Sequence, residues 1–340
     1  MILPLHMSRV NPAQASRRQF LGAAVTTAAA ALARPASAAE SAAPAKARNP
    51  FVYSFKIGEM EAWSISDGSA LLREGIGLMW PEEDRPAMVE DLKLRGERLD
   101  ALPLYINILV VRSGKEVAIF DAGFGQVTNP DLGWLEDGLG QIGISPEAVT
   151  AAFLSHAHVD HINGFVKDNK PVFTNAALHA LQAEVDFWRS PEPDFSKSKR
   201  DKKPLPNMIK NARDKFDVLQ PNLQLLKGGE VLLNGAVTVE AAPGHTDGHL
   251  ICRVQSGQES LLHIMDVAHH HTLMFTNPHW GVAFDHQPDQ ARDTRKKVFS
   301  RLAATHERAY GFHLPWPGLG RVTTRGAGYG WEAERWSWGV

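Results

Sequence analysis

Three histidines and one aspartate lie within six consecutive residues of this chain, in the run His156-Ala157-His158-Val159-Asp160-His161. Imidazole nitrogens and carboxylate oxygens are the usual protein ligands of zinc-type metal ions. His156 and His158 point the same way if the backbone stays extended, because alternate side chains of a strand share one face. Asp160 and His161 come after the chain turns, so they can face a second point. The run therefore predicts a single loop that serves two metal ions.

Three further candidate ligands each follow a short apolar run that reads as a strand. They are His245 in Pro-Gly-His-Thr-Asp-Gly-His, Asp266 after His-Ile-Met, and His313 after Gly-Phe. Rigid strands fix the residues at their ends, while loops stay free to bind a substrate. We therefore expect these three residues to meet the histidine-rich run at one end of a central sheet. For any one histidine taken singly, an ordinary hydrogen-bonded residue is the alternative.

The elements that must position these residues alternate between β-rich and helical stretches. Alternating or apolar runs predict strands at 53–56, 62–66, 104–111, 116–120, 152–154, 231–233, 237–240, 250–254, 261–265 and 309–312. Helical patterns cover 175–188, about 206–216 and 288–305, and helix-start and turn signals lie at 130–140 and 145–151. Asn234-Gly235 is a strong hairpin signal. This order suggests two βα halves that face each other.

Taken in order, the motifs HxHxDH and PGHTxGH, an aspartate after a strand and a final histidine resemble the signature of the metallo-β-lactamase superfamily. The resemblance covers essentially all of the chain after residue 50. It implies an α/β fold, the αββα sandwich, in which Asp121 supports the metal loop from outside the coordination sphere. It also implies three ligands for each of two metal ions and one bridging ligand: His156, His158 and His245; Asp160, His161 and His313; and Asp266.

Within the superfamily, the chain most resembles the binuclear group that includes methyl parathion hydrolase and the lactonases. It retains Asp266, and the segments 186–190 and 313–320 are similar to that group. The resemblance implies a substrate pocket lined by Phe187, Trp188 and Trp316, although core packing is equally open for Trp188. Lactonases usually carry a tyrosine three residues after the bridging aspartate, where this chain has His269. His269 either replaces that hydrogen-bond donor or belongs to a solvated turn.

The expected chemistry is hydrolysis, because two dications that share a water lower its pKa enough to leave a bridging hydroxide near neutral pH. That hydroxide can attack a carbonyl carbon or phosphorus, while Asp160 and Asp266 help manage the proton. We expect two divalent ions, most simply zinc, and a small-molecule substrate that is an apolar ester, a lactone or an organophosphate triester. The alternatives are a β-lactam or thioester hydrolase, then a sulfur dioxygenase with one iron, then a non-catalytic periplasmic metal-binding protein.

The N-terminus has the layout of an export signal rather than of a folded element. Arg17-Arg18 precede an apolar, alanine-rich run that ends at Ala36-Ser37-Ala38. The arginine pair resembles a twin-arginine signal, which implies the twin-arginine export machinery as a partner and a periplasmic location. The run is too short for a permanent membrane anchor. We therefore expect residues 1–38 to be a cleaved signal peptide, 39–50 a flexible tether, and 51–340 the catalytic domain.

Charge and cysteine content exclude other classes of protein. The chain carries 36 Lys and Arg against 38 Asp and Glu, and residues 1–38 contribute arginines but no acid. The mature protein is therefore acidic, which disfavours a nucleic-acid partner. Cys252 is the single cysteine, so no intramolecular disulfide can form. The aromatic C-terminus, with Trp331, Trp336 and Trp338, either closes over the core or forms a homodimer contact.

Overall fold

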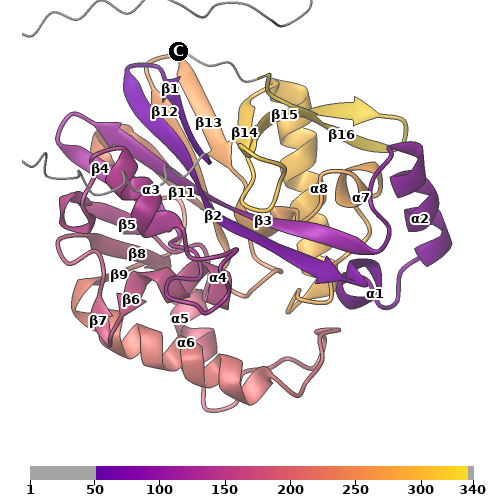
Figure 1. The fold of residues 1–340 in the computed structure, drawn as a ribbon, viewed down its shortest axis with the longest axis horizontal. Coiled ribbons are helices and arrows are strands. Elements are labelled where there is room, and N and C mark those ends of the chain that lie inside the picture. Colours follow the sequence, from indigo (N-terminus) through magenta and orange to yellow (C-terminus); the bar gives the residue numbers. More distant parts are fainter. Residues whose placement is uncertain (1–50, 336–340) are drawn as a thin grey trace, which may run out of the picture. The chain divides into compact units, whose positions relative to one another are not determined.

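The computed structural model describes residues 51–335, so the predicted signal peptide and tether lie outside the described residues. The described part contains two seven-stranded sheets and a two-stranded ribbon (Figure 1). In the first sheet β1 to β4 pair antiparallel, and β4, β5, β8 and β9 pair parallel. Its strand order is β1 (Val52–Ile57), β2 (Met60–Arg73), β3 (Ala101–Ser113), β4 (Glu116–Phe120), β5 (Ala151–Phe153), β8 (Ala177–Leu181) and β9 (Leu223–Leu226).

The second sheet is antiparallel except where β13 and β14 pair in parallel. The hairpin predicted at Asn234-Gly235 is confirmed, since these residues form the turn that joins β10 to β11. The strand order is β10 (Val231–Leu232), β11 (Val237–Ala241), β12 (Leu250–Ser256), β13 (Glu259–His263), β14 (Arg308–Tyr310), β15 (Leu319–Arg325) and β16 (Gly328–Ala333).

Helices cover the outer face of each sheet. Side chains of α3 (Leu135–Gln141), α5 (Gln182–Arg189) and α6 (Leu205–Leu219) pack in one cluster with the first sheet. The helix α8 (Pro288–Thr305), which has the predicted bounds, packs on the second sheet. Figure 1 shows these helices on the two sides of the paired sheets. The predicted αββα sandwich is confirmed.

The core between the sheets is built from the inward side chains of both. Phe120 and Phe153, on neighbouring strands of the first sheet, stack with ring centroids 4.9 Å apart. They belong to the same buried cluster as Val239 and Leu261 of the second sheet. Burial of each such large apolar side chain stabilises the fold by about 1.5–3 kcal/mol. The two sheets are thereby held face to face, which fixes the strand ends relative to one another.

Two regions differ from the sequence prediction. The helical pattern predicted over 175–188 is wrong in its first half, because 177–181 form β8, which pairs with β5 and β9. The helices α1 (Gly75–Met79) and α2 (Arg85–Leu94), inserted between β2 and β3, were not predicted. They share a small core with α7 (Leu273–Thr276). The remaining short elements are α4 (Val159–Ile162), β6 (Val166–Lys167) and β7 (Lys170–Pro171).

In the range 51–335, no helix is both long enough and apolar enough to cross a bilayer.

Candidate metal centre

The histidine-rich run follows β5 and changes backbone conformation in its middle. His158 is extended, with φ −68° and ψ 157°, and it directly precedes the short helix α4, which carries Asp160 and His161. An extended segment followed by a helical turn is the arrangement that the spacing predicts. As a result, one loop directs His156 and His158 toward one point and the α4 residues toward another.

The first group of ligand atoms consists of three imidazole nitrogens and a carboxylate. Nδ1 of His158 lies 2.9 Å from Nε2 of His156 and 3.0 Å from Nε2 of His245. Oδ2 of Asp266 lies 3.2 Å from the same nitrogen of His245. Metal–nitrogen bonds of about 2.0–2.1 Å in a tetrahedral site place ligand nitrogens roughly 3.3 Å apart. These four buried side chains therefore have the composition and spacing of a tetrahedral metal site.

The second group lies on the other side of Asp266. Oδ2 of Asp160 is 3.7 Å from Nε2 of His161 and 3.5 Å from Nε2 of His313. Asp266 reaches this group with both oxygens, because Oδ1 lies 3.4 Å from Nε2 of His161 and Oδ2 lies 3.2 Å from Nε2 of His313. All seven predicted ligands thus gather in one place, with Asp266 shared between the two groups.

Unsatisfied polar atoms show that this cluster fits metal ions. Nε2 of His161 and Oδ1 of Asp266 are buried and have no hydrogen-bond partner among the described residues. Leaving such an atom unpaired costs about 1–3 kcal/mol of folding free energy. A cation bound by both atoms would remove that cost. Burial lowers the pKa of His156 and His158 well below the usual value, so both rings are neutral near pH 7 and have lone pairs for a metal.

Comparison with known proteins agrees with this geometry. The sequence model of the metallo-beta-lactamase superfamily matches residues 101–313. The chain belongs to this superfamily. It is a hydrolase of the metallo-β-lactamase fold, and its His and Asp groups form a metal-binding site.

Solved structures place this superfamily member near lactonases and other hydrolases. It is similar to AidC, a dizinc quorum-quenching lactonase in complex with the product N-hexanoyl-L-homoserine, with 32% identity, a TM-score of 0.81, and coverage of 84% of this chain and 98% of that chain. It is similar to the hydrolase AbOPH of the β-lactamase superfamily, with 25% identity, a TM-score of 0.77, and coverage of 86% and 100%. A quorum-quenching N-acyl homoserine lactone lactonase shares the fold, with 16% identity, a TM-score of 0.54, and coverage of 78% and 100%. No curated protein is significantly similar.

Asp121 has the position expected of a supporting residue in this metallo-β-lactamase fold. Its Oδ2 accepts a hydrogen bond from Nδ1 of His161 at 2.8 Å and from the Ser155 hydroxyl at 2.6 Å. The same hydroxyl lies 2.9 Å from Nδ1 of His156. A histidine whose Nδ1 hydrogen is held in this way presents Nε2 to a metal in a fixed orientation. Asp121 therefore orients one histidine of each ligand group.

Asp285 supports His245 in the same way, although the sequence reasoning missed it. Nδ1 of His245 donates to Oδ1 of Asp285 at 2.9 Å, and both side chains are buried. The guanidinium of buried Arg295 lies 3.6 Å from the other oxygen and also donates to the Val267 carbonyl. Asp285 follows a loop without a recognisable motif. The adjacent Asp-His pair at 285–286 is the one signal that could have pointed to it.

Glu184 connects the two ligand loops, and it was also missed. It is fully buried on α5 and accepts from the Ala157 amide at 2.8 Å and the Trp188 indole at 2.7 Å. Its other oxygen accepts from the Thr246 hydroxyl at 2.5 Å and the Gly248 amide at 3.1 Å. A Cβ on Gly248 would lie 2.0 Å from the Glu184 nitrogen, so only glycine allows this approach. Glu184 therefore sets the separation of the first and second histidine motifs.

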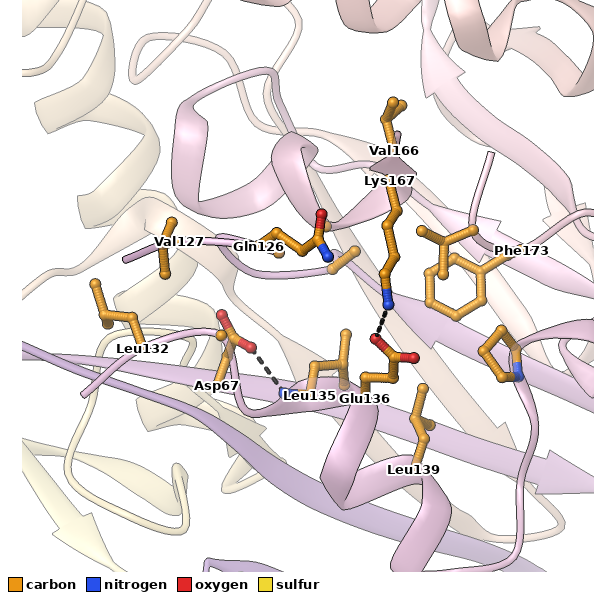
Figure 2. Close-up of a pocket in the computed structure, with 16 residues that line it drawn as sticks. Asp67, Gln126, Val127, Leu132, Leu135, Glu136, Leu139, Val166, Lys167 and Phe173 are labelled. Atoms are coloured by element: carbon orange, nitrogen blue, oxygen red, sulfur yellow. Dashed lines mark hydrogen bonds and ion pairs between the residues drawn. The ribbon is translucent and has the colours of Figure 1, made fainter. Parts of the chain in front are cut away.

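The loop after Asp121 is held by Asp67, which sits in a bulge of β2. Asp67 accepts from the amides of Phe124 at 2.8 Å and Leu135 at 2.9 Å, and burial raises its pKa to about 7. Asp67 helps to line a cavity of about 320 Å³. Figure 2 shows the lining side chains, which include the Lys167–Glu136 ion pair. The cavity is formed mainly by α3, the loop before it and the β6–β7 ribbon. The cavity therefore belongs to the loop that Asp67 holds, and none of the seven candidate metal ligands lines it.

The residues predicted to line a substrate pocket lie in different settings. Trp188 is fully buried, and its ring is edge-on to His158 at 6.1 Å, which favours the packing alternative. Phe187 is half-buried against His286 at 4.6 Å. Trp316 is half-buried and edge-on to Phe51 at 5.7 Å. Their contact with substrate stays a prediction.

The solvated turn considered for the histidine triplet is wrong for His269 and His270, which are buried. Nε2 of His269 lies 3.1 Å from Oδ2 of Asp266, and His269 forms a separate group of neighbouring ligand atoms with Asp266 and His313. Nδ1 of His270 accepts from the amides of Thr272 and Leu273, so the neutral ring carries its proton on Nε2, which faces Glu97 at 3.4 Å. Within the triplet, His269 therefore lies at the metal centre, whereas His270 connects Glu97 to the start of α7.

Proposed function

We propose that this hydrolase is a binuclear metal enzyme that cleaves the ester bond of an uncharged small molecule, with lactones as the first substrate class. The observation that carries the proposal is the position of Asp266, whose carboxylate lies within 3.4 Å of ligand nitrogens of both groups. The similarity to AidC, at 32% identity over 84% of this chain, supports the lactone class. An organophosphate triester is the second class, because it presents the same kind of polarised centre to an attacking water.

The proposed ligand sets follow the two groups in the structure. The first ion would be held by His156, His158 and His245, and the second by Asp160, His161 and His313, with Asp266 available to both. When bound, a pair of divalent ions, most simply zinc, lowers the pKa of water between them and polarises the scissile carbonyl.

The remaining chemistry falls to side chains of this chain. In this proposal, Asp160 and Asp266 help to manage the proton that the attacking water gives up. Burial lowers the pKa of His269 to about 4, so its ring is neutral near pH 7 and carries one hydrogen to donate. Nε2 lies 3.1 Å from Oδ2 of the Asp266 anion, so the single hydrogen belongs on Nε2. A donor at this position suits the negative charge that develops on the carbonyl oxygen.

A substrate panel with metal removal tests this function. The panel contains N-hexanoyl-homoserine lactone, an aryl phosphotriester, a thioester and nitrocefin. We expect lactone hydrolysis that is abolished by chelation and restored by zinc, and that is absent in His156→Ala. Turnover of nitrocefin or the thioester without turnover of the lactone or triester would overturn the proposal, as would lactone turnover that survives complete loss of metal.

We also propose that residues 1–38 direct export through the twin-arginine route to the periplasm. The support is the arginine pair before an apolar run and a small-residue cleavage site. Expressed in a bacterium, the protein should be recovered from the periplasm with its N-terminus near residue 39. The double variant Arg17→Lys, Arg18→Lys should stay in the cytoplasm. Periplasmic recovery of both forms would contradict this route.

A further inference from the structure

The loop of residues 190–204, which joins α5 to α6, lies against the supports of the metal centre. Phe195 packs on His286 with ring centroids 4.6 Å apart, and His286 directly follows Asp285. The Ser198 hydroxyl donates to the Ala283 carbonyl at 3.1 Å. This packing holds the loop beside the His245 side of the centre. It also determines where the next charged side chain, Arg200, must lie.

Arg200 is a half-buried cation that lacks a carboxylate partner among the described residues. Its Nε is fully buried and unpaired, and none of the acids between residues 51 and 335 forms an ion pair with it. One terminal nitrogen donates to the sulfur of Met208 at 3.2 Å, which is a weak acceptor. The guanidinium also lies over the Phe284 ring at 5.4 Å from its centroid. Burying a charge without a partner is costly, so a retained unpaired guanidinium is a candidate for ligand binding.

Several contacts place this guanidinium at the metal centre. Phe284, beneath it, has its ring 6.4 Å from the ring of His269. His286, on which the same loop packs through Phe195, has its ring 5.6 Å from the ring of His158. Burial lowers the pKa of Arg200, and the charges of Asp160 and Asp285 oppose that effect. Arg200 therefore lies beside both ligand groups without being tied to any acid in them.

We propose that Arg200 determines substrate specificity by donating hydrogen bonds to a second oxygen of the substrate, outside the bond that is cleaved. This rests on the proposed function and narrows it to esters and lactones that carry a further acceptor, such as an acyl amide. The guanidinium offers several donors in a fixed plane and suits carbonyl or carboxylate oxygens. A site built to donate such a bond discriminates strongly against an analogue that lacks the acceptor.

The test compares two lactones of the same ring size, N-hexanoyl-homoserine lactone with an amide and γ-decalactone without one. The variants are Arg200→Met and Arg200→Lys, with Lys203→Met, an exposed residue of the same loop, as the control. Arg200→Met should lower kcat/KM for the amide lactone roughly 10- to 100-fold, mainly through KM, which is the usual effect of losing a hydrogen bond to a charged group. Turnover of γ-decalactone should stay within about 2-fold of wild type and shows that the variant is folded. Arg200→Lys should recover part of the loss.

A binding measurement gives a readout independent of turnover. The dissociation constant of the product N-hexanoyl-homoserine, measured by calorimetry, should rise about 10-fold or more in Arg200→Met, while metal content stays at the wild-type level. Equal loss on both lactones, or no change on either, would overturn the role of Arg200. A wild type that hydrolyses neither the lactones nor an aryl phosphotriester, but binds the product through Arg200, would overturn the proposed function alone. A wild type that hydrolyses none of these substrates and does not bind the product would overturn both.

Discussion

At the scale of single residues, Asp266 has the position on which both groups of ligand atoms depend. Burial works against its ionisation, but the surrounding rings, above all His161 and His313, outweigh burial and hold the pKa of this carboxyl well below its usual range. Asp266 is thus an anion near pH 7, surrounded by nitrogens at 3.1–3.6 Å from its oxygens. A carboxylate in that setting binds cations or protonated imidazoles, and the unpaired ligand atoms favour cations.

The substitution Asp266→Ala should therefore reduce metal content and activity together. Metal per chain should fall below the wild-type value, and kcat/KM should fall by more than the roughly 10- to 100-fold that loss of an outer partner costs. Elemental analysis and kinetics of the purified variant measure the two effects. Asp289→Ala, at an exposed position, is the control and should keep both values. Wild-type metal content and turnover in Asp266→Ala would contradict the shared-ligand role.

Asp285→Asn tests whether the partner of His245 acts on the metal. The amide keeps the size of the side chain but removes the charge that holds the Nδ1 hydrogen of His245. Affinity for the metal should fall roughly 10- to 100-fold, as for other outer partners of histidine ligands. Competition with a chromophoric chelator measures this affinity. An affinity equal to that of Asp289→Asn would show that Asp285 serves packing alone.

The seven ligands could be predicted from the sequence because their types, spacing and strand-end positions are unusual together. Asp285 and Glu184 could not, since each is a lone acid whose partners lie far away in the chain. Glu184 bonds to Thr246 and Gly248 across more than 60 residues. Only the folded chain shows which donors reach such a residue.

At the scale of elements, the metal centre depends on two loops that are joined by the helix α5. Local patterns predicted that the loops follow strands, but they did not predict this connection. The segment 177–181 shows the reason, because Ala-Leu-His-Ala-Leu suits either a helix or a buried strand. Parallel pairing with β5 and β9 decides for the strand, and the chain then enters α5 at the point where Glu184 can reach both loops.

Glu184→Gln should destabilise the protein through these loops. The amide nitrogen of glutamine cannot accept from backbone amides, so at least one buried donor loses its partner. The free energy of unfolding should fall by about 1–3 kcal/mol, measured by denaturant titration. The same change at Glu136, whose ion pair with Lys167 is largely exposed, should change it by about 0–1 kcal/mol. Equal effects at the two sites would refute the connecting role of Glu184.

At the scale of the whole molecule, the sandwich brings ligands from both sheets to one place. His156 to His161 follow β5 of the first sheet, whereas His245, Asp266 and His313 follow β11, β13 and β14 of the second. Bound metal would therefore connect the two halves of the fold as well as serve catalysis. The αββα class could be predicted because the motif order resembles one superfamily. The α1–α2 insertion could not, since its short helices are stabilised by contacts with α7.

Removal of metal should lower the thermal stability of the described domain. A ligand present at about 100 times its dissociation constant stabilises the native state by roughly 2.7 kcal/mol. For a domain of this size that corresponds to a fall in Tm of about 4–5 °C on chelation. Scanning calorimetry with and without chelator measures it, and readdition of zinc should restore the Tm. A Tm that does not respond to chelation would show that metal does not join the sheets.

The central claim is that seven side chains hold a pair of ions that share Asp266. Elemental analysis of the purified mature protein, after zinc loading and exhaustive dialysis, tests it most directly. The account predicts two divalent ions per chain. A single ion per chain, whether zinc or iron, would contradict it.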